Sequence, residues 1–168
     1  MRTPLARLLT ALLLFALAAC GSDTVPGKAA AEPGSGPVQT RVPVDLRPVT
    51  AVAQGTEPTG PDEFAGDDGS LYTVGPSIAD ISRLEDVKAE STENGTGWVV
   101  TIKLSADAAA KFGSWTAEHV GERLAIVVDG KLVSAPQIAS PIPGGEVQIS
   151  GNFTEKSAKQ LAADISGK

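Results

Sequence analysis

The sequence predicts an α+β domain of two layers, in which two amphipathic helices cover a mostly antiparallel sheet of about five to six strands. Three observations lead to this prediction. Short β-branched and apolar runs are joined by glycine-containing turns, which is typical of antiparallel hairpins. Two segments, 105–120 and 154–167, repeat apolar residues at helical spacing. The strands and helices follow one another in the order of three strands, a helix, three strands and a helix, which is an α+β arrangement.

The clearest hairpin begins with residues 124–128, an apolar and largely β-branched run. Asp129-Gly130 follows directly, and both residue types tolerate the positive φ that a type I′ turn requires. The returning strand, residues 132–136, ends in a proline, which has no N–H for a ladder and marks a candidate sheet edge. A third strand is expected at residues 146–150, where polar and apolar side chains alternate. These three strands predict the nucleus of one sheet.

Further strands are expected upstream of this nucleus. Residues 71–74 form a short β-prone run, and residues 86–92 and 98–104 flank the glycine-rich turn 94–97 as the two arms of a hairpin. Residues 78–84 are ambiguous and predict at most one helical turn.

Two helices are bounded by recognisable caps. Ser105 is a suitable N-cap for a helix that runs to about residue 120, where Gly121 ends it. Thr154 caps the last helix, and Gly167 closes it. Apolar residues of the last helix fall at i, i+3, i+4 and i+7, and they are Ala158, Leu161, Ala162 and Ile165.

The N-terminus predicts a targeting segment. Two arginines in the first seven residues precede an apolar run, residues 8–16, that is too short for a membrane-spanning helix. Small residues then stand directly before Cys20, the single cysteine, and this order resembles a bacterial lipobox. We therefore expect residues 1–19 to be a lipoprotein signal peptide and Cys20 to be the lipidation site, carrying palmitate or a similar acyl group. Two acyl chains would anchor the chain stably on the outer face of the cytoplasmic membrane.

Residues 20–69 predict a linker, because they hold seven of the twelve prolines together with much Gly, Ala, Ser and Thr. Within this range, residues 41–53 either belong to the linker or pack on the domain as an edge strand, since several aliphatic residues surround Pro43 and Pro48. The folded domain is expected at residues 70–168.

The run VDGKLVSAP at 128–136, followed by IPGG and ISGNFT, resembles the head subdomain of the first large periplasmic domain of SecD, the auxiliary subunit of the Sec protein-export machinery. The resemblance continues upstream through YTVGPSIADI, GWVVTIKLS and FGSWTAEHVGERLAIV and covers roughly residues 71–168. A weaker similarity, VDLRPV at 44–49, matches the strand that leads into the head in SecD. The resemblance implies a SecD periplasmic head-like fold on the extracytoplasmic side.

The resemblance also implies contact with polypeptide that emerges on the outer side of the Sec translocon. We therefore expect a non-enzymatic module that binds the Sec translocon or secreted polypeptides as an accessory to export. Binding would use either strand addition at the edge 132–136 or a groove of apolar side chains; the alternative is that these side chains cap the core. The candidate contact residues are Leu132, Ile138, Ile142, Pro143 and Phe153.

The sequence offers little for catalysis. His119 is the only histidine, and it stands beside no nucleophile or orienting group other than glutamates of its own helix. Zinc-ligand spacing, a phosphate-binding loop and a nucleophile elbow are all missing from the sequence. We therefore expect no catalytic residue, no metal and no cofactor. The formal net charge of −6 argues against nucleic acid as a partner.

Two other interpretations remain open at this point. The chain would be a structural or small-ligand-binding lipoprotein of the cell envelope that reuses the SecD head fold without a role in export. An envelope enzyme is a third and weaker alternative. An exposed groove or an open sheet edge would favour polypeptide binding, whereas a closed pocket with converging polar groups would favour a small ligand.

Overall fold

The computed structural model describes residues 37–92 and 95–167. The predicted signal peptide, Cys20, linker residues 20–36 and Asn94 of the predicted turn lie outside these ranges. The described residues form nine strands and two helices, which confirms the α+β class. In chain order the elements are β1 (Val38–Gln39), β2 (Val44–Gln54), β3 (Glu63–Ala65), β4 (Ser70–Val74), β5 (Arg83–Ser91), β6 (Trp98–Leu104), α1 (Ala106–Glu118), β7 (Leu124–Val128), β8 (Lys131–Ser134), β9 (Glu146–Phe153) and α2 (Glu155–Ser166).

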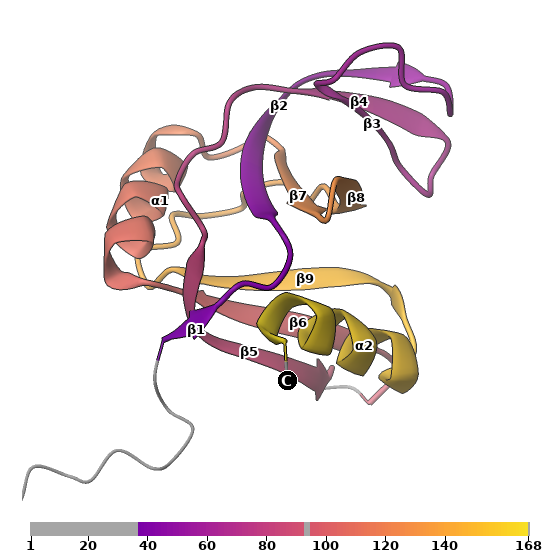
Figure 1. Cartoon of the computed structure of the whole chain (residues 1–168). Coiled ribbons are helices and arrows are strands. Elements are labelled where there is room, and N and C mark those ends of the chain that lie inside the picture. The colour runs from indigo at the N-terminus through magenta and orange to yellow at the C-terminus, as the bar shows by residue number, and fades with distance from the viewer. Residues whose placement is uncertain (1–36, 93–94, 168) are drawn as a thin grey trace, which may run out of the picture. The chain divides into compact units, whose positions relative to one another are not determined.

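The strands are divided between two antiparallel sheets, where the sequence predicts one. The four-stranded sheet has the order β1-β5-β6-β9, and the five-stranded sheet has the order β3-β4-β2-β7-β8. Although β7, β8 and β9 follow one another in the chain, β9 pairs with β6 in the other sheet (Figure 1). The predicted three-stranded nucleus is therefore wrong in its third strand, because the proline-rich connection after β8 passes α1 before the chain re-enters a sheet.

The range expected to be a linker contributes three strands to the fold. β2 is flanked by two partners: residues 44–48 pair with β7, and the rest of the strand pairs with β4. Of the two alternatives for residues 41–53, the structure therefore shows the strand that packs on the domain: β2 lies between β4 and β7 near Pro48 and has a strand partner on one side only over residues 50–54. Pro48 stands where β2 passes from one partner to the other, and its carbonyl oxygen accepts a hydrogen bond from Gly75 N–H at 2.8 Å. The sequence did not predict this strand clearly, because the prolines of residues 20–69 indicated a linker.

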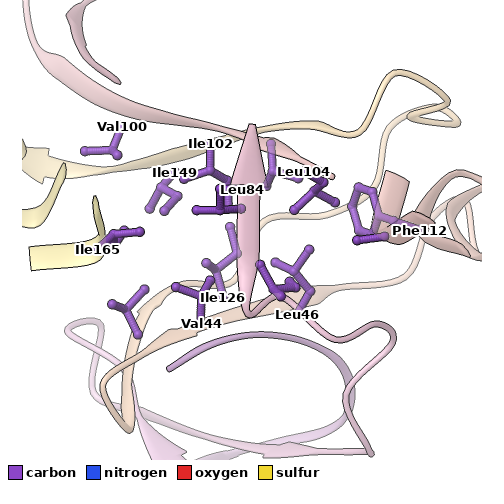
Figure 2. Close-up of a cluster of buried hydrophobic side chains, with 14 of the residues drawn as sticks. Val44, Leu46, Leu84, Val100, Ile102, Leu104, Phe112, Ile126, Ile149 and Ile165 are labelled. Atoms are coloured by element: carbon purple, nitrogen blue, oxygen red, sulfur yellow. The ribbon is translucent and has the colours of Figure 1, made fainter. Parts of the chain in front are cut away.

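The main core lies between the two sheets, and both helices contribute to it. Figure 2 shows side chains of the two sheets directed toward one another, with Phe112 of α1 and Ile165 of α2 beside them. Residues of β7 alternate between this core and a smaller cluster on the other face of the five-stranded sheet, so all five of its side chains are buried. The smaller cluster consists of buried Val74, Ala125 and Val127 with half-buried Val49, Phe64 and Leu132.

The predicted turns and caps are largely confirmed. Asp129 and Gly130 have φ values of 51° and 70°, as the hairpin between β7 and β8 requires. Thr154 Oγ1 accepts a hydrogen bond from Ser157 N–H at 3.2 Å at the start of α2. Ser105 precedes α1 but makes no side-chain capping bond. Residues 76–82 form bends rather than the helical turn considered for 78–84.

Candidate polypeptide-binding surface

The five predicted contact residues come from three separate places in the fold. Leu132 lies in β8 and packs on the smaller cluster, whereas Ile138 is only 4% exposed and belongs to the main core. Ile142 and Pro143 lie in the connection before β9, and Phe153 ends that strand opposite Trp98. Because a strand rises about 3.3 Å per residue, the two ends of the eight-residue strand β9 lie about 23 Å apart. Ile138, Ile142, Pro143 and Phe153 therefore do not form the single apolar groove that the sequence predicted.

Hydrogen bonds tie the connection between β8 and β9 to α1. Thr116, which is 0% exposed, accepts a hydrogen bond from Ile142 N–H at 3.0 Å and donates one to Gly113 O at 3.1 Å. The N–H of Ile138 donates to Glu122 O at 2.8 Å. Ile138 and Ile142 therefore hold this connection against the domain, and only Pro143 of this group is exposed.

The structure places β8 at an end of the five-stranded sheet, as expected for an edge strand. However, Cα atoms of β3, the strand at the other end of the same sheet, approach those of β8 to within 8 Å. A strand inserted between two others needs about two spacings of 4.8 Å, or roughly 9.6 Å in total. A hollow of about 210 Å³ lies beside Tyr72, Leu132 and Ser134. The gap of at most 8 Å where β3 approaches β8 is thus narrower than the roughly 9.6 Å that a strand inserted between them would need.

A larger groove of about 650 Å³ separates the β7–β8 hairpin from α2. Its apolar surface comes from half-buried Val42, Val133 and Leu161, together with buried Val128. Two basic and two acidic side chains line it as well, so it carries no excess of either charge. We call this the hairpin groove, and its charged lining consists of Arg41, Asp129, Lys131 and Asp164.

A second hollow of about 700 Å³ adjoins the hairpin groove, since both are lined by Arg41 and Val42. The rest of its lining consists of residue 40, residues 43–45, residues 77–82 and Lys111 of α1. The segment that separates β1 from β2 is fixed here, because Arg41 N–H donates to Ile165 O near the end of α2 at 2.9 Å. Residues 41–42 therefore form a common border between two open hollows.

Sequence reasoning did not identify the residues of the hairpin groove. Val133 lies within the expected strand 132–136, and Leu161 lies on the apolar stripe of the expected last helix. Both positions follow the pattern of core residues. Only the packing of two sheets brings β8 and α2 to opposite sides of one groove, and no short-range pattern in the sequence encodes that proximity.

The described residues show no arrangement that points to catalysis at His119. Its ring stacks on Trp115 with centroids 4.1 Å apart, and its Nδ1 lies 2.7 Å from Trp115 O. In the two described ranges, no group of three or more His, Cys, Asp or Glu side chains could hold a metal ion. The same ranges contain no helix long and apolar enough to cross a membrane.

One ionisable pair fixes the turn before β4. Tyr72 Oη donates a hydrogen bond to Asp68 Oδ2 at 2.7 Å. This bond lowers the pKa of Asp68, because it stabilises the carboxylate, and raises the pKa of Tyr72, because the phenol must keep its proton to donate.

Comparison with known proteins places this fold in a family. The family model described as the SecDF P1 head subdomain matches residues 61–167. The protein translocase subunit SecD of Mycobacterium tuberculosis is 38% identical over 96 residues, which are 55% of this chain and 17% of that protein. The SecD subunit of Acidaminococcus fermentans is 43% identical over 79 residues, which are 47% of this chain and 19% of that protein. The chain thus spans less than a fifth of the length of these relatives.

Solved structures agree with this result. A structure described as a membrane component SecDF that enhances protein export has a TM-score of 0.58 at 26% identity, covering 74% of this chain and 61% of that one. SecDF in its super-membrane-facing form gives a TM-score of 0.57 at 25% identity, covering 75% of this chain and 19% of that one. Since the family model spans more than half of the sequence, the chain belongs to the SecDF P1 head subdomain family.

Proposed function

We propose that this chain is a membrane-tethered extracytoplasmic lipoprotein whose head domain binds polypeptide, without enzymatic activity, as an accessory to Sec-dependent protein export. Family membership supports the link with export, because the relatives are translocase subunits and one solved SecDF is described as enhancing protein export. Because the chain matches only the head of these proteins, we propose binding for it and not the activity of a whole translocase subunit.

The hairpin groove is the observation that carries this proposal. Its apolar side chains, Val42, Val133 and Leu161, suit apolar side chains of an extended polypeptide. Its balanced charges repel neither basic nor acidic segments. A surface that binds many secreted chains needs this low selectivity, because the chains share apolar residues but no common sequence.

The lipid anchor would hold the domain where exported polypeptides emerge. Cys20 follows an apolar segment and small residues in the order of a lipobox. Acylation there would restrict the domain to the outer face of the cytoplasmic membrane, next to the Sec translocon. The acidic composition is consistent with protein, rather than nucleic acid, as the partner.

Photocrosslinking in the native host tests polypeptide binding. A benzoylphenylalanine probe at Val133 or Leu161 is expected to give adducts with Sec subunits or with many secreted chains. The matched control is a probe at Ala117, which is exposed on α1 and does not line the hairpin groove. Silent groove probes in a well-expressed, membrane-bound protein would count against the proposal and favour an envelope lipoprotein that uses the fold for another purpose.

The anchor has a separate test. Replacing Cys20→Ala is expected to abolish labelling by an alkyne analogue of palmitate and to release the protein from the membrane fraction. Labelling that persists in this variant would show that Cys20 is not the lipidation site.

A further inference from the structure

The far end of β2 presents an open sheet edge. β7 pairs with β2 only up to Pro48, opposite Leu124, and β4 pairs with residues 49–54 from the other side. β7 does not extend along residues 50–54. On that side of β2, these residues have no strand partner within the described part of the chain. Figure 1 shows this end of β2 beside β4, beyond the end of β7. We call residues 50–54 the β2 edge.

The hydrogen-bond pattern shows which backbone groups face the open side. Ser70 O accepts from Gly66 N–H, and Val74 N–H donates to Asp62 O, so these residues of β4 bond toward β3. Residues alternate along an antiparallel ladder. Leu71 and Thr73 therefore bond toward β2, where their partners are Ala53 and Ala51.

The residues between these partners on β2 bond in the opposite direction. Val52 and Gln54 direct their N–H and C=O groups away from β4. These groups form the template that an additional strand would need.

The side chains of the β2 edge do not protect it. The sequence Thr-Ala-Val-Ala-Gln contains no charge and no proline, all five residues are exposed, and Val52 is 49% exposed. Proteins usually protect such edges with charged side chains, proline or a covering segment. A neutral exposed edge is therefore an available binding site.

The outer edge of β5 provides a contrast in the same molecule. Beyond its short pairing with β1, it carries Asp86, Lys88 and Glu90. Asp86 accepts a hydrogen bond from Val87 N–H at 2.9 Å and forms an ion pair with Lys88 at 2.7 Å. The N–H of Val87 in β5 is therefore already hydrogen-bonded. The comparable N–H groups of the β2 edge stand among neutral side chains.

A hollow of about 540 Å³ adjoins the β2 edge. It is lined by residues 48–52 and by Glu122 and Arg123, which immediately precede β7. It thus lies between the open edge and the point where β7 begins. A strand added to β2 would lie in the sheet next to residues 50–54, where β7 does not reach. Its side chains would enter this hollow.

We propose that the β2 edge takes up an extended segment of unfolded polypeptide by strand addition. This inference rests on the proposed function and names a second contact surface for the same polypeptide. Pairing would use the backbone of the bound segment, which every sequence shares, and the neutral edge side chains impose no charge preference. Such an edge suits clients of many sequences.

The size of the edge favours a transient polypeptide over a second copy of this chain. A stable protein–protein interface has about 20–30 residues on each side. The β2 edge offers five residues, with the few that line its hollow. A short edge instead suits weak and reversible capture, which a chain in transit requires.

The test uses the full chain in phosphatidylcholine nanodiscs and a fluorescent, reduced and carboxymethylated α-lactalbumin, which stays unfolded. Val52→Pro removes an outward N–H while leaving the bonds of Ala51 and Ala53 to β4. Loss of the hydrogen bond from this N–H, and of the regular backbone of the edge, is expected to raise the Kd for the fluorescent polypeptide about tenfold. Fluorescence anisotropy measures this Kd. The matched control Val52→Ala keeps the N–H and is expected to bind within about twofold of the unmodified chain.

Amide exchange in the unmodified chain gives an independent readout, which covers the case that the proline variant loses structure. The probe is expected to slow exchange at Val52 and Gln54 and to leave the β5 edge unchanged. If the unmodified chain binds and Val52→Pro binds equally well, with no slowing at Val52, the β2 edge is not the site although polypeptide binding stands. If the unmodified chain binds no probe, the proposed function fails, and this inference with it. A dimer that Val52→Pro dissociates would assign the edge to a second copy and overturn the proposal.

Discussion

The two halves of β2 belong to one strand but have opposite surroundings. In the first half Val44 and Leu46 are 4% and 0% exposed and lie between the two sheets. In the second half every residue from 50 to 54 is exposed, and Val52 is 49% exposed. The difference arises because β7 and the second sheet cover only the first half. One strand thus contributes stability at one end and leaves a template for binding at the other.

The largest expected effect is in the buried half. Leu46→Ala removes a fully buried side chain from the main core and should lower the free energy of unfolding by about 2–5 kcal/mol. Chemical denaturation followed by tryptophan fluorescence measures this loss. Leu46→Met, which nearly conserves volume, is the control and should cost less than about 1.5 kcal/mol. A small loss for Leu46→Ala would mean that this half of β2 does not anchor the core.

A smaller effect is expected where a polar group completes the same core. Thr116→Val keeps the shape of the side chain but removes the acceptor for Ile142 N–H. The expected loss of unfolding free energy is about 1–3 kcal/mol, because a partly buried donor is left unpaired. Thr116→Ser retains the hydroxyl and should lose only about 1 kcal/mol, since it removes one methyl group. If the serine variant were the less stable of the two, packing rather than the hydrogen bond would hold this connection.

Local patterns predicted the fold best where both signals and partners are close in sequence. Asp129-Gly130 specifies the hairpin between β7 and β8, and Thr154 specifies the start of α2. The division into two sheets was missed, because β9 is adjacent to β8 in sequence but pairs with β6. Partner choice depends on long-range packing of apolar faces, and apolar alternation is the same for either partner.

The candidate binding surfaces were predicted less well than the fold. Ile138 and Ile142 are apolar residues in a proline-rich segment, a composition shared by exposed binding loops and by loops packed on a helix. The β2 edge lay in a range whose prolines indicated a linker. Whether an apolar residue is buried or offered to a partner depends on which elements cover it, and this information is not local in the sequence.

β4 pairs with the exposed half of β2, and its contribution to stability is expected to depend on pH. Tyr72 lies opposite Val52 in the ladder and donates to Asp68. Because the folded pKa of Asp68 is lowered, the stabilising contribution is present above about pH 4 and is lost as pH falls through the folded value. Because the folded pKa of Tyr72 is raised, the contribution is present below about pH 10 and is lost as pH rises through the folded value.

Tyr72→Phe should therefore reduce stability near neutral pH, by less than Thr116→Val does, since Asp68 is exposed. The difference between Tyr72→Phe and the unmodified chain should shrink at both pH extremes. Thermal unfolding across pH 3–11 measures it, spanning the ordinary pKa values of both groups, about 4 and 10. A difference that is independent of pH would indicate that packing of the Tyr72 ring, and not the hydrogen bond to Asp68, stabilises β4.

The smallest expected effect is in the exposed half of β2. Val52→Ala removes two methyl groups that are already half in contact with water, so the free energy of unfolding should change by no more than about 0.5 kcal/mol. The denaturation experiment used for Leu46→Ala measures both variants under the same conditions, which makes the contrast within one strand direct. A loss at Val52 as large as that at Leu46 would show that residues 50–54 help to hold the domain together. The two halves of β2 would then share one structural role, and the β2 edge would not be available to bind a polypeptide.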